Sequence, residues 1–159
     1  QLVAAMNPCR CGFLGSQTRA CSCNAGEINR HRTRLSGPLL DRIDLFLEVG
    51  SWEGDFLTRS ADIGLKEAGD GWRQVPCQAD LIRARARLRQ WRDQDLRGLL
   101  TREAAQFLDG AREPLGLSLR GMERCVAVAA TVAALDGAAA ITDDHAREAL
   151  EFRREVSLV

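Results

Sequence analysis

The sequence lacks any run of 18 consecutive apolar residues, so no segment is long enough to cross a membrane as a helix. The apolar residues 1–6 are too few for a signal peptide and lack its flanks. We therefore expect a soluble, cytoplasmic protein without a membrane partner. The chain opens on this run without an initiator methionine, which indicates a piece cut from a longer polypeptide.

Net charge is absent and lysine is almost absent. The 159 residues hold 22 basic and 22 acidic side chains, which excludes an overall field that would attract nucleic acid or an anionic membrane. Positive charge is local instead, with a net charge of +3 over residues 1–47 and +5 over residues 73–92. These two stretches could bind the phosphate groups of a nucleic acid. Lys66 is the single lysine. The other basic residues are arginines, whose fork suits carboxylate and phosphate, although genome composition explains such a bias equally well.

With 45% apolar residues, the chain is long enough for one ordinary domain or two small ones. Residues 50–77 are rich in glycine and mixed charge and show no sustained period, which predicts a linker or surface excursion. This segment is the natural boundary between residues 1–49 and residues 78–159.

The first part shows strand and helix signals. Residues 1–6 and 43–49 have the apolar patterns of strands. Asn24, followed three residues later by Glu27, predicts a capping box and a short basic helix. Proline then favours another short helix over residues 38–42.

The second part is predicted to be helical throughout. Alanine content and an apolar stripe favour a helix ending near Trp91, although its arginines also alternate as in a strand. Thr101, Ser118 and Thr142 are N-cap residues for three further helices, which end near residues 113, 136 and 154. Four short helices predict a small bundle.

Two C-x-C pairs, nine residues apart, form the most specific local signal. In a reducing compartment, four clustered thiols favour a metal over disulfides, because four thiolates close a tetrahedral shell around zinc. An iron–sulfur cluster and unligated thiols are the alternatives, and His31 could replace one sulfur. The other two cysteines stand alone, and Cys125 lies on an apolar helical stripe typical of a core. The predicted ligands of a structural Zn²⁺ are Cys9, Cys11, Cys21 and Cys23.

Three stretches, in this order, resemble the bacterial magnesium-chelatase-like AAA+ proteins of the ComM/YifB type. They are VAAMNPC at residues 3–9 with the paired cysteines, SGPLLDRIDL at residues 36–45 and LSLRG at residues 117–121. The resemblance implies a mainly α chain, in which a four-helix AAA+ lid bundle follows an incomplete piece of an AAA+ α/β core with a cysteine-rich zinc loop. It assigns residues 1–49 to that core and residues 78–159 to the lid.

The resemblance also implies three roles in ATP hydrolysis. Asn7 matches the sensor 1 residue that orients the attacking water, although asparagine before proline also simply makes a turn. Arg42 matches an arginine finger that reaches a neighbouring subunit's nucleotide, and its alternative is a salt bridge with Asp41 or Asp44. Arg120 matches the sensor 2 arginine, and without the resemblance it is an ordinary surface residue.

The sequence lacks the phosphate-binding pattern G-x-x-x-x-G-K-[ST], and the surroundings of Lys66 do not form one. The upstream acidic Mg²⁺ motif expected from the resemblance is missing too. We therefore expect the chain alone to be inactive, with ATP and Mg²⁺ bound only in a full-length protein.

The leading hypothesis is that the chain is the C-terminal part of an ATPase that assembles as a ring, which we expect to be a hexamer. This ATPase would act on DNA in recombination, as a branch-migration helicase of the ComM type. A second hypothesis is the motor subunit of a metal chelatase. A third is a zinc-stapled binding or adaptor module without catalysis.

Overall fold

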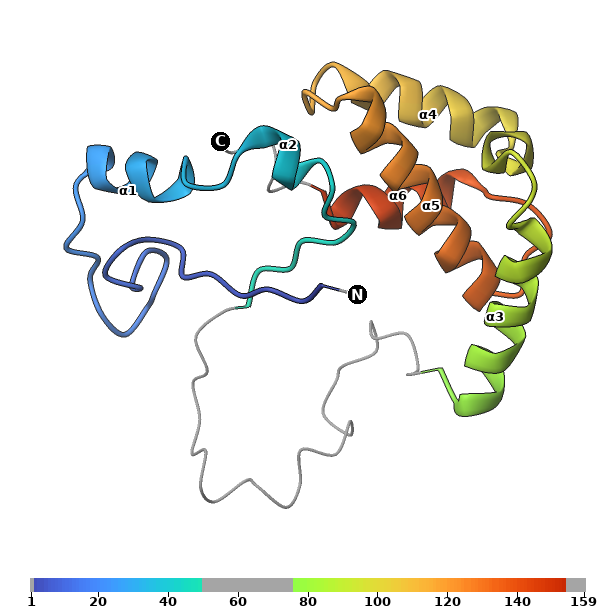
Figure 1. Ribbon diagram of the computed structural model, residues 1–159, viewed down its shortest axis with the longest axis horizontal. Helices are drawn as coiled ribbons and strands as arrows, with labels where there is room; N and C mark the ends of the chain where they lie inside the picture. Colours follow the sequence, from blue (N-terminus) through green and yellow to red (C-terminus); the bar gives the residue numbers. More distant parts are fainter. Residues whose placement is uncertain (1, 50–75, 154–159) are drawn as a thin grey trace.

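The computed structural model describes residues 2–49 and 76–153. Over these ranges the chain is mainly helical, as predicted (Figure 1). The helices are α1 (Ala25–Arg32), α2 (Gly37–Leu40), α3 (Gln78–Trp91), the 3-10 helix η1 (Leu96–Leu99), α4 (Arg102–Arg112), α5 (Leu119–Leu135) and α6 (Asp143–Glu151). Most of the segment 50–77, predicted as a linker and containing Lys66, lies outside the described residues.

Side-chain caps begin several of these helices where the sequence predicts them. Asn24 Oδ1 accepts the Glu27 N–H at 2.9 Å, and the Glu27 carboxylate accepts the Asn24 N–H at 3.0 Å, which completes the capping box of α1. Thr101 and Ser118 accept amide hydrogens in the first turns of α4 and α5. The far ends are less predictable, since α6 ends at Glu151, three residues before the expected end.

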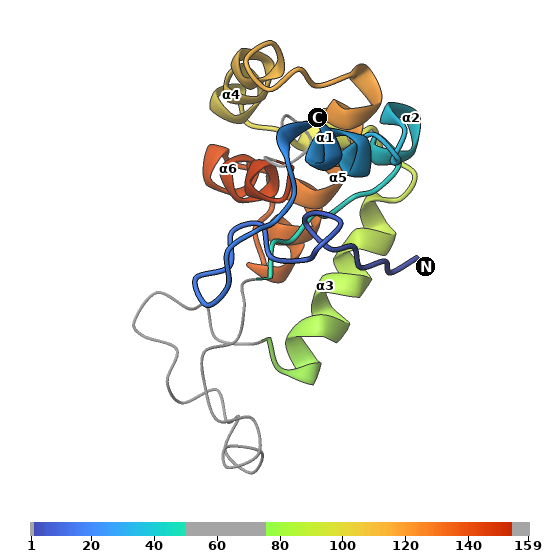
Figure 2. The same cartoon turned by 90° about the vertical axis from the view of Figure 1, so that its left-hand side faces the viewer.

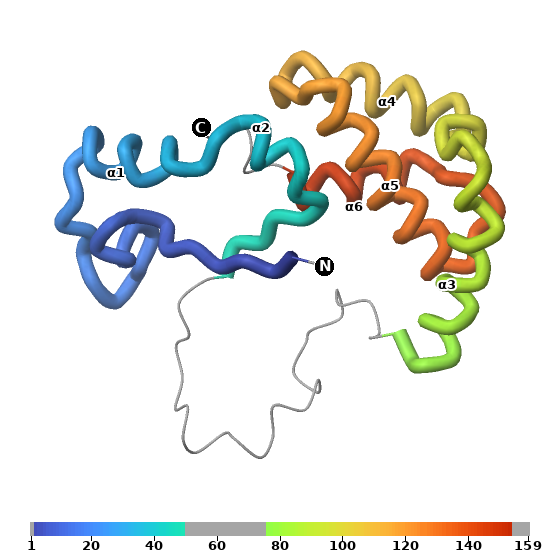
Figure 3. The backbone as a smooth tube through the Cα atoms, viewed as in Figure 1, coloured from blue at the N-terminus to red at the C-terminus, as the bar shows by residue number. Residues whose placement is uncertain are grey.

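Helices α3, α4, α5 and α6 share one apolar core. Figure 2 shows the arrangement of these four helices from a second side. Helix α5 packs against α3 and α6, and α4 packs against α6. Small side chains let these helices approach closely, and Cys125 and Ala129 on the inner face of α5 are completely buried. The first turn of α3 extends past the other helices (Figure 3), so Leu81 is 46% exposed although it continues the predicted apolar stripe.

The predicted strands at residues 1–6 and 43–49 are wrong for the residues that the structure describes. Residues 2–6 and 43–49 form no ladder, and the one isolated bridge in the described ranges joins Leu100 to Ile141. A strand needs a neighbour that pairs its N–H and C=O groups, and neither segment has one there. The apolar side chains expected in a sheet core are therefore exposed, with Val3 at 86% and Val49 at 88%.

Residues 36–46 lead back from the N-terminal loop to the helices. Figure 1 shows α2 between α1 on one side and the group α3–α6 on the other. The Phe46 N–H donates to the Phe152 carbonyl at 2.9 Å, which places this segment beside the end of α6. No helix of the described residues is long and apolar enough to cross a membrane.

Candidate metal centre and functional site

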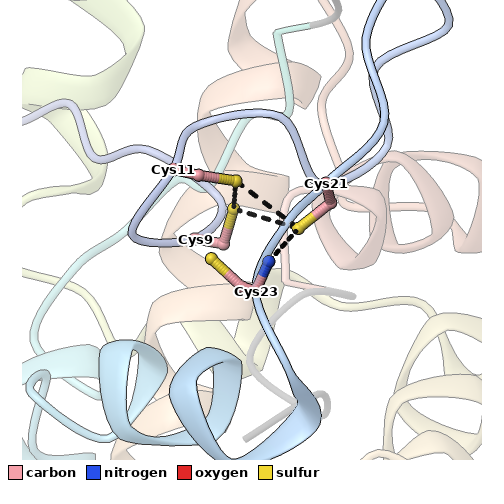
Figure 4. A group of neighbouring side chains, drawn as sticks. All are labelled: Cys9, Cys11, Cys21 and Cys23. Atoms are coloured by element: carbon pink, nitrogen blue, oxygen red, sulfur yellow. Dashed lines mark hydrogen bonds between the residues drawn. The ribbon is translucent and has the colours of Figure 1, made fainter.

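Four sulfur atoms meet in the N-terminal loop (Figure 4). The Sγ atoms of Cys9 and Cys11 lie 3.4 Å apart, and Cys21 Sγ lies 3.7 Å from the first and 3.5 Å from the second. Cys23 completes the group, in which all four Sγ atoms lie within 4.8 Å of one another. Cys9 is buried and the other three are half-buried. The two C-x-C pairs thus face each other.

Tight turns bring the two pairs together. Gly12 and Gly15 have φ values of 83° and 80°, a left-handed conformation that glycine adopts without strain. The Gly12 N–H donates to the Cys9 carbonyl at 3.1 Å, and the Cys23 N–H donates to Cys21 Sγ at 3.4 Å. Glycine at these two positions therefore lets the backbone fold back so that the second pair meets the first.

The donor set fits a tetrahedral metal ion. Four thiolates about 2.3 Å from zinc would lie roughly 3.8 Å from one another, close to the observed sulfur separations. All four cysteines are free, and their sulfur separations are far longer than a disulfide bond. The cluster does not include His31, whose Nε2 donates to the Asn7 carbonyl at 2.9 Å. His31 instead holds α1 against the loop.

The sulfurs differ in their acidity. Backbone N–H groups, first that of Phe13, lower the pKa of Cys11 to about 5. Burial raises the pKa of Cys9, but hydrogen bonds outweigh burial and the pKa falls below its usual value. A backbone hydrogen bond lowers the pKa of both Cys21 and Cys23, yet burial and the neighbouring sulfurs raise them, that of Cys21 to about 12. Two sulfurs therefore favour the thiolate form that a metal requires.

The predicted nucleotide-site residues are all exposed. Asn7 lies at the end of the extended segment, with its carbonyl bonded to His31. Arg42 follows α2, and its Nη1 donates to the Pro38 carbonyl at 2.7 Å. Among the described residues Arg42 forms no ion pair with Asp41 or Asp44, so the alternative reading of this arginine is not found there.

The segment that carries Arg42 and the segment that carries Arg120 lie together. Ser118 Oγ donates to Asp41 Oδ2 at 2.9 Å and accepts the Gly121 N–H at 3.0 Å. One hydroxyl therefore joins the residue before Arg42 to the turn that carries Arg120. Asp44 also pairs with Arg124 of α5, at 3.1 Å. No described contact of Asn7 leads to this junction, since its carbonyl bonds to α1.

Arg153 also belongs to this junction, and its contact there cannot be predicted from the sequence. Arg153 stands one residue before the predicted helix end near residue 154, where a basic residue complements the helix macrodipole. In the structure it lies beyond α6 and is completely buried against the segment that follows Arg42. Nothing in the sequence distinguishes it from the other arginines.

A groove lies between α3, η1 and α5, with a volume of about 560 Å³. Arg85 and Arg89 of α3 and its C-cap residue Arg92 follow one face at helical spacing and are exposed. The floor is apolar and is formed by Leu88, Trp91, Leu96, Ala127 and Ala130.

Comparison with known families identifies the family to which these motifs belong. The family profile described as magnesium chelatase, subunit ChlI, matches residues 1–56. The profile described as magnesium chelatase, subunit ChlI C-terminal, matches residues 77–153. The chain belongs to the magnesium-chelatase-like family. Both the cysteine loop and the helices α3 to α6 of this family member fall within the matched ranges.

Individual relatives agree with this assignment. The family member is 35% identical over 157 residues to the uncharacterised protein YifB of Escherichia coli, an alignment that covers 96% of this chain and 30% of YifB. It is 35% identical over 166 residues to the competence protein ComM of Haemophilus influenzae, covering 100% of this chain and 31% of ComM. An uncharacterised protein of Mycobacterium tuberculosis is 34% identical over 167 residues. The chain spans about a third of the length of these relatives, and no solved structure gives a significant match.

Proposed function

We propose that this chain is the C-terminal part of a ring-forming AAA+ ATPase of the ComM type. The observation that carries the proposal is the hydrogen bond between Ser118 and Asp41, which joins the segment of Arg42 to the helix start of Arg120. In the proposal, residues 1–49 complete an ATPase core and residues 78–159 form the helical lid of that ATPase. Residues 50–77 connect the core to the lid.

The proposal gives each of the three exposed site residues a role in ATP hydrolysis. Arg42 reaches a neighbouring subunit and neutralises charge on the transferring phosphoryl group, a role suited to the guanidinium fork. Arg120, in the first turn of α5, senses the nucleotide from the lid. Asn7 orients the attacking water. Exposure supports the two arginine roles, because a residue that acts across a subunit boundary or on a nucleotide must be accessible.

The cysteine cluster would hold a structural Zn²⁺. A closed shell of four thiolates leaves no open position for catalysis, so the ion would cross-link the loop. The loop needs such a cross-link because, of its residues 9–23, only Cys9 is buried.

DNA is the proposed substrate of the full-length ring. The groove of α3 supports this, since arginines one turn apart can follow successive phosphates along a strand. We expect the triple variant Arg85→Gln/Arg89→Gln/Arg92→Gln to weaken binding of single-stranded DNA and to reduce the log–log salt slope by about 2, because each phosphate contact to a single strand contributes about 0.7. Fluorescence anisotropy measures both, and Arg102→Gln/Arg112→Gln on exposed positions of α4 is the control. Equal binding by both variants would remove the groove from the proposal.

The central experiment is steady-state ATP hydrolysis by the full-length protein that the proposal implies. Loss of a finger that acts in trans lowers kcat by about 10³-fold or more, which we expect for Arg42→Ala. Arg112→Ala, an exposed arginine at the end of α4, should leave the rate unchanged. A rate for Arg42→Ala equal to that of the wild type would instead favour a zinc-stapled adaptor without a motor role.

The description of the matching profile favours a second candidate, the motor subunit of a metal chelatase. The two candidates differ in what stimulates ATP hydrolysis. Stimulation by DNA supports the ComM-type motor, whereas stimulation only by a porphyrin-binding subunit supports the chelatase.

A further inference from the structure

Arg153 is a buried charge with incomplete hydrogen bonding. Its exposed fraction is 0%, and its Nη1 donates to the Ile43 carbonyl. Its guanidinium also lies 5.6 Å from the centre of the Phe46 ring. Nε and Nη2 are buried without a hydrogen-bond partner. A guanidinium in this setting is costly for folding, and an apolar side chain of similar size would be cheaper.

The N-terminal turn of α5 is shaped around this side chain. A Cβ atom on Gly121 would lie 3.2 Å from Arg153 Nη2, closer than most side-chain contacts. Glycine is otherwise unfavourable inside a helix. Its presence at this position therefore leaves room for the guanidinium, in the same turn that Ser118 caps.

The side-chain hydrogen bond and the ring contact of Arg153 both lead to the segment that follows Arg42. Besides the bond to Ile43, the preceding residue Phe152 accepts the Phe46 N–H at 2.9 Å. The other side-chain link from the helices to residues 43–46, between Arg124 of α5 and Asp44, joins two exposed side chains and contributes little in water. Arg153 is thus the buried contact that fixes residues 43–46 to the helices.

We propose that Arg153 is a positioning residue that locks residues 43–46 onto the start of α5 and the end of α6 and thereby sets the direction of Arg42. The locking itself is a property of this chain. Its effect on catalysis rests on the proposed function, in which Arg42 reaches the neighbouring nucleotide.

The lock is tested by amide hydrogen exchange in the 159-residue chain. Arg153→Met keeps the volume but removes the donors, so the Phe46 amide should exchange about tenfold faster or more. The Ala129 amide in the middle of α5 should stay as slow as in the wild type or become slower, because a buried charge is gone. Arg153→Lys, which keeps one donor and the charge, should restore part of the protection.

Arg124→Gln is the matched control, since it removes an exposed arginine of α5 that pairs with Asp44 in the same segment. It should change the exchange of Phe46 by no more than about threefold. Gly121→Ala tests the lock from the other side, because its methyl group displaces Nη2 and should also speed exchange at Phe46. Unchanged protection of Phe46 in Arg153→Met would overturn the proposal, and so would equal acceleration at Phe46 and Ala129, which marks a general core residue.

In the full-length protein, Arg153→Met should lower kcat without raising the KM for ATP, and should add nothing to the loss caused by Arg42→Ala. A normal rate for Arg42→Ala contradicts the proposed function but leaves the exchange result standing. A large loss for Arg42→Ala with a normal kcat for Arg153→Met overturns the positioning role alone.

Discussion

At the scale of single residues, four thiols within 4.8 Å of one another repel as thiolates unless a cation lies among them. We therefore expect one zinc ion per chain, measured by mass spectrometry of the purified protein. Cys9→Ser/Cys21→Ser should lose the ion, because a serine hydroxyl is a poor zinc ligand. Cys77→Ser, an exposed cysteine outside the cluster, is the control and should keep it. Wild-type protein without metal and with freely reactive thiols would contradict the zinc site.

Ser118 has two functions at the start of α5, since it caps the helix and donates to Asp41. Ser118→Ala removes both bonds, and we expect it to lower the free energy of unfolding by about 1–3 kcal/mol. Thr131→Ala on the exposed face of α5 removes only a bond to the Ala127 carbonyl and should change stability by less than about 0.5 kcal/mol. Urea unfolding followed by circular dichroism compares the two, and equal effects would show that neither the cap nor the link to Asp41 adds stability.

At the scale of elements, the helices α3 to α6 owe their arrangement to side-chain burial. Leu108 of α4 is only 2% exposed, whereas Leu119 at the start of α5 is 68% exposed. Leu108→Ala should cost about 2–5 kcal/mol through lost burial and a cavity, while Leu119→Ala should be nearly neutral. Thermal unfolding monitors both variants. Similar melting temperatures would mean that α4 is not part of the cooperative core.

Local sequence rules worked well for elements that are stabilised locally. The capping box of Asn24 and Glu27 depends on side chains three residues apart, so it could be predicted from the sequence. The same kind of rule predicted a strand at residues 43–49, and this prediction is wrong. Strand formation needs a distant partner, and the alternation of side chains does not supply one. In its place, residue 46 bonds to residue 152, a contact that no local pattern contains.

At the scale of the whole molecule, the cysteine loop and the helical group are stabilised by different forces. The described part of the loop buries little apart from Cys9, whereas α5 buries nine of its residues. A chelator should therefore speed amide exchange at Gly12 and Cys23 while leaving Ala129 protected. Exchange measured by NMR with and without the chelator tests this. Uniform protection across both parts, unchanged by the chelator, would contradict two separately stabilised units.

The candidate sites divide in the same way. The clustered cysteines could be found from the sequence because a cluster built on C-x-C pairs and glycine turns leaves its spacing in the chain. Arg42 and Arg120 were predicted by resemblance, and their roles stay predictions. The contact between their segments through Ser118 and Asp41 spans 77 positions and could not be read from either segment alone.

The sequence by itself determined the helical character of residues 78–153, the helix caps and the cysteines that cluster, because each follows from side chains close together in the chain. Only the tertiary structure decided that residues 43–46 lie on the ends of α5 and α6 instead of in a sheet, and that Arg153 alone among the described arginines is completely buried. The physical reason is that burial and pairing are set by whichever distant group is adjacent in space, and one arginine in the sequence does not differ from another until that group is known.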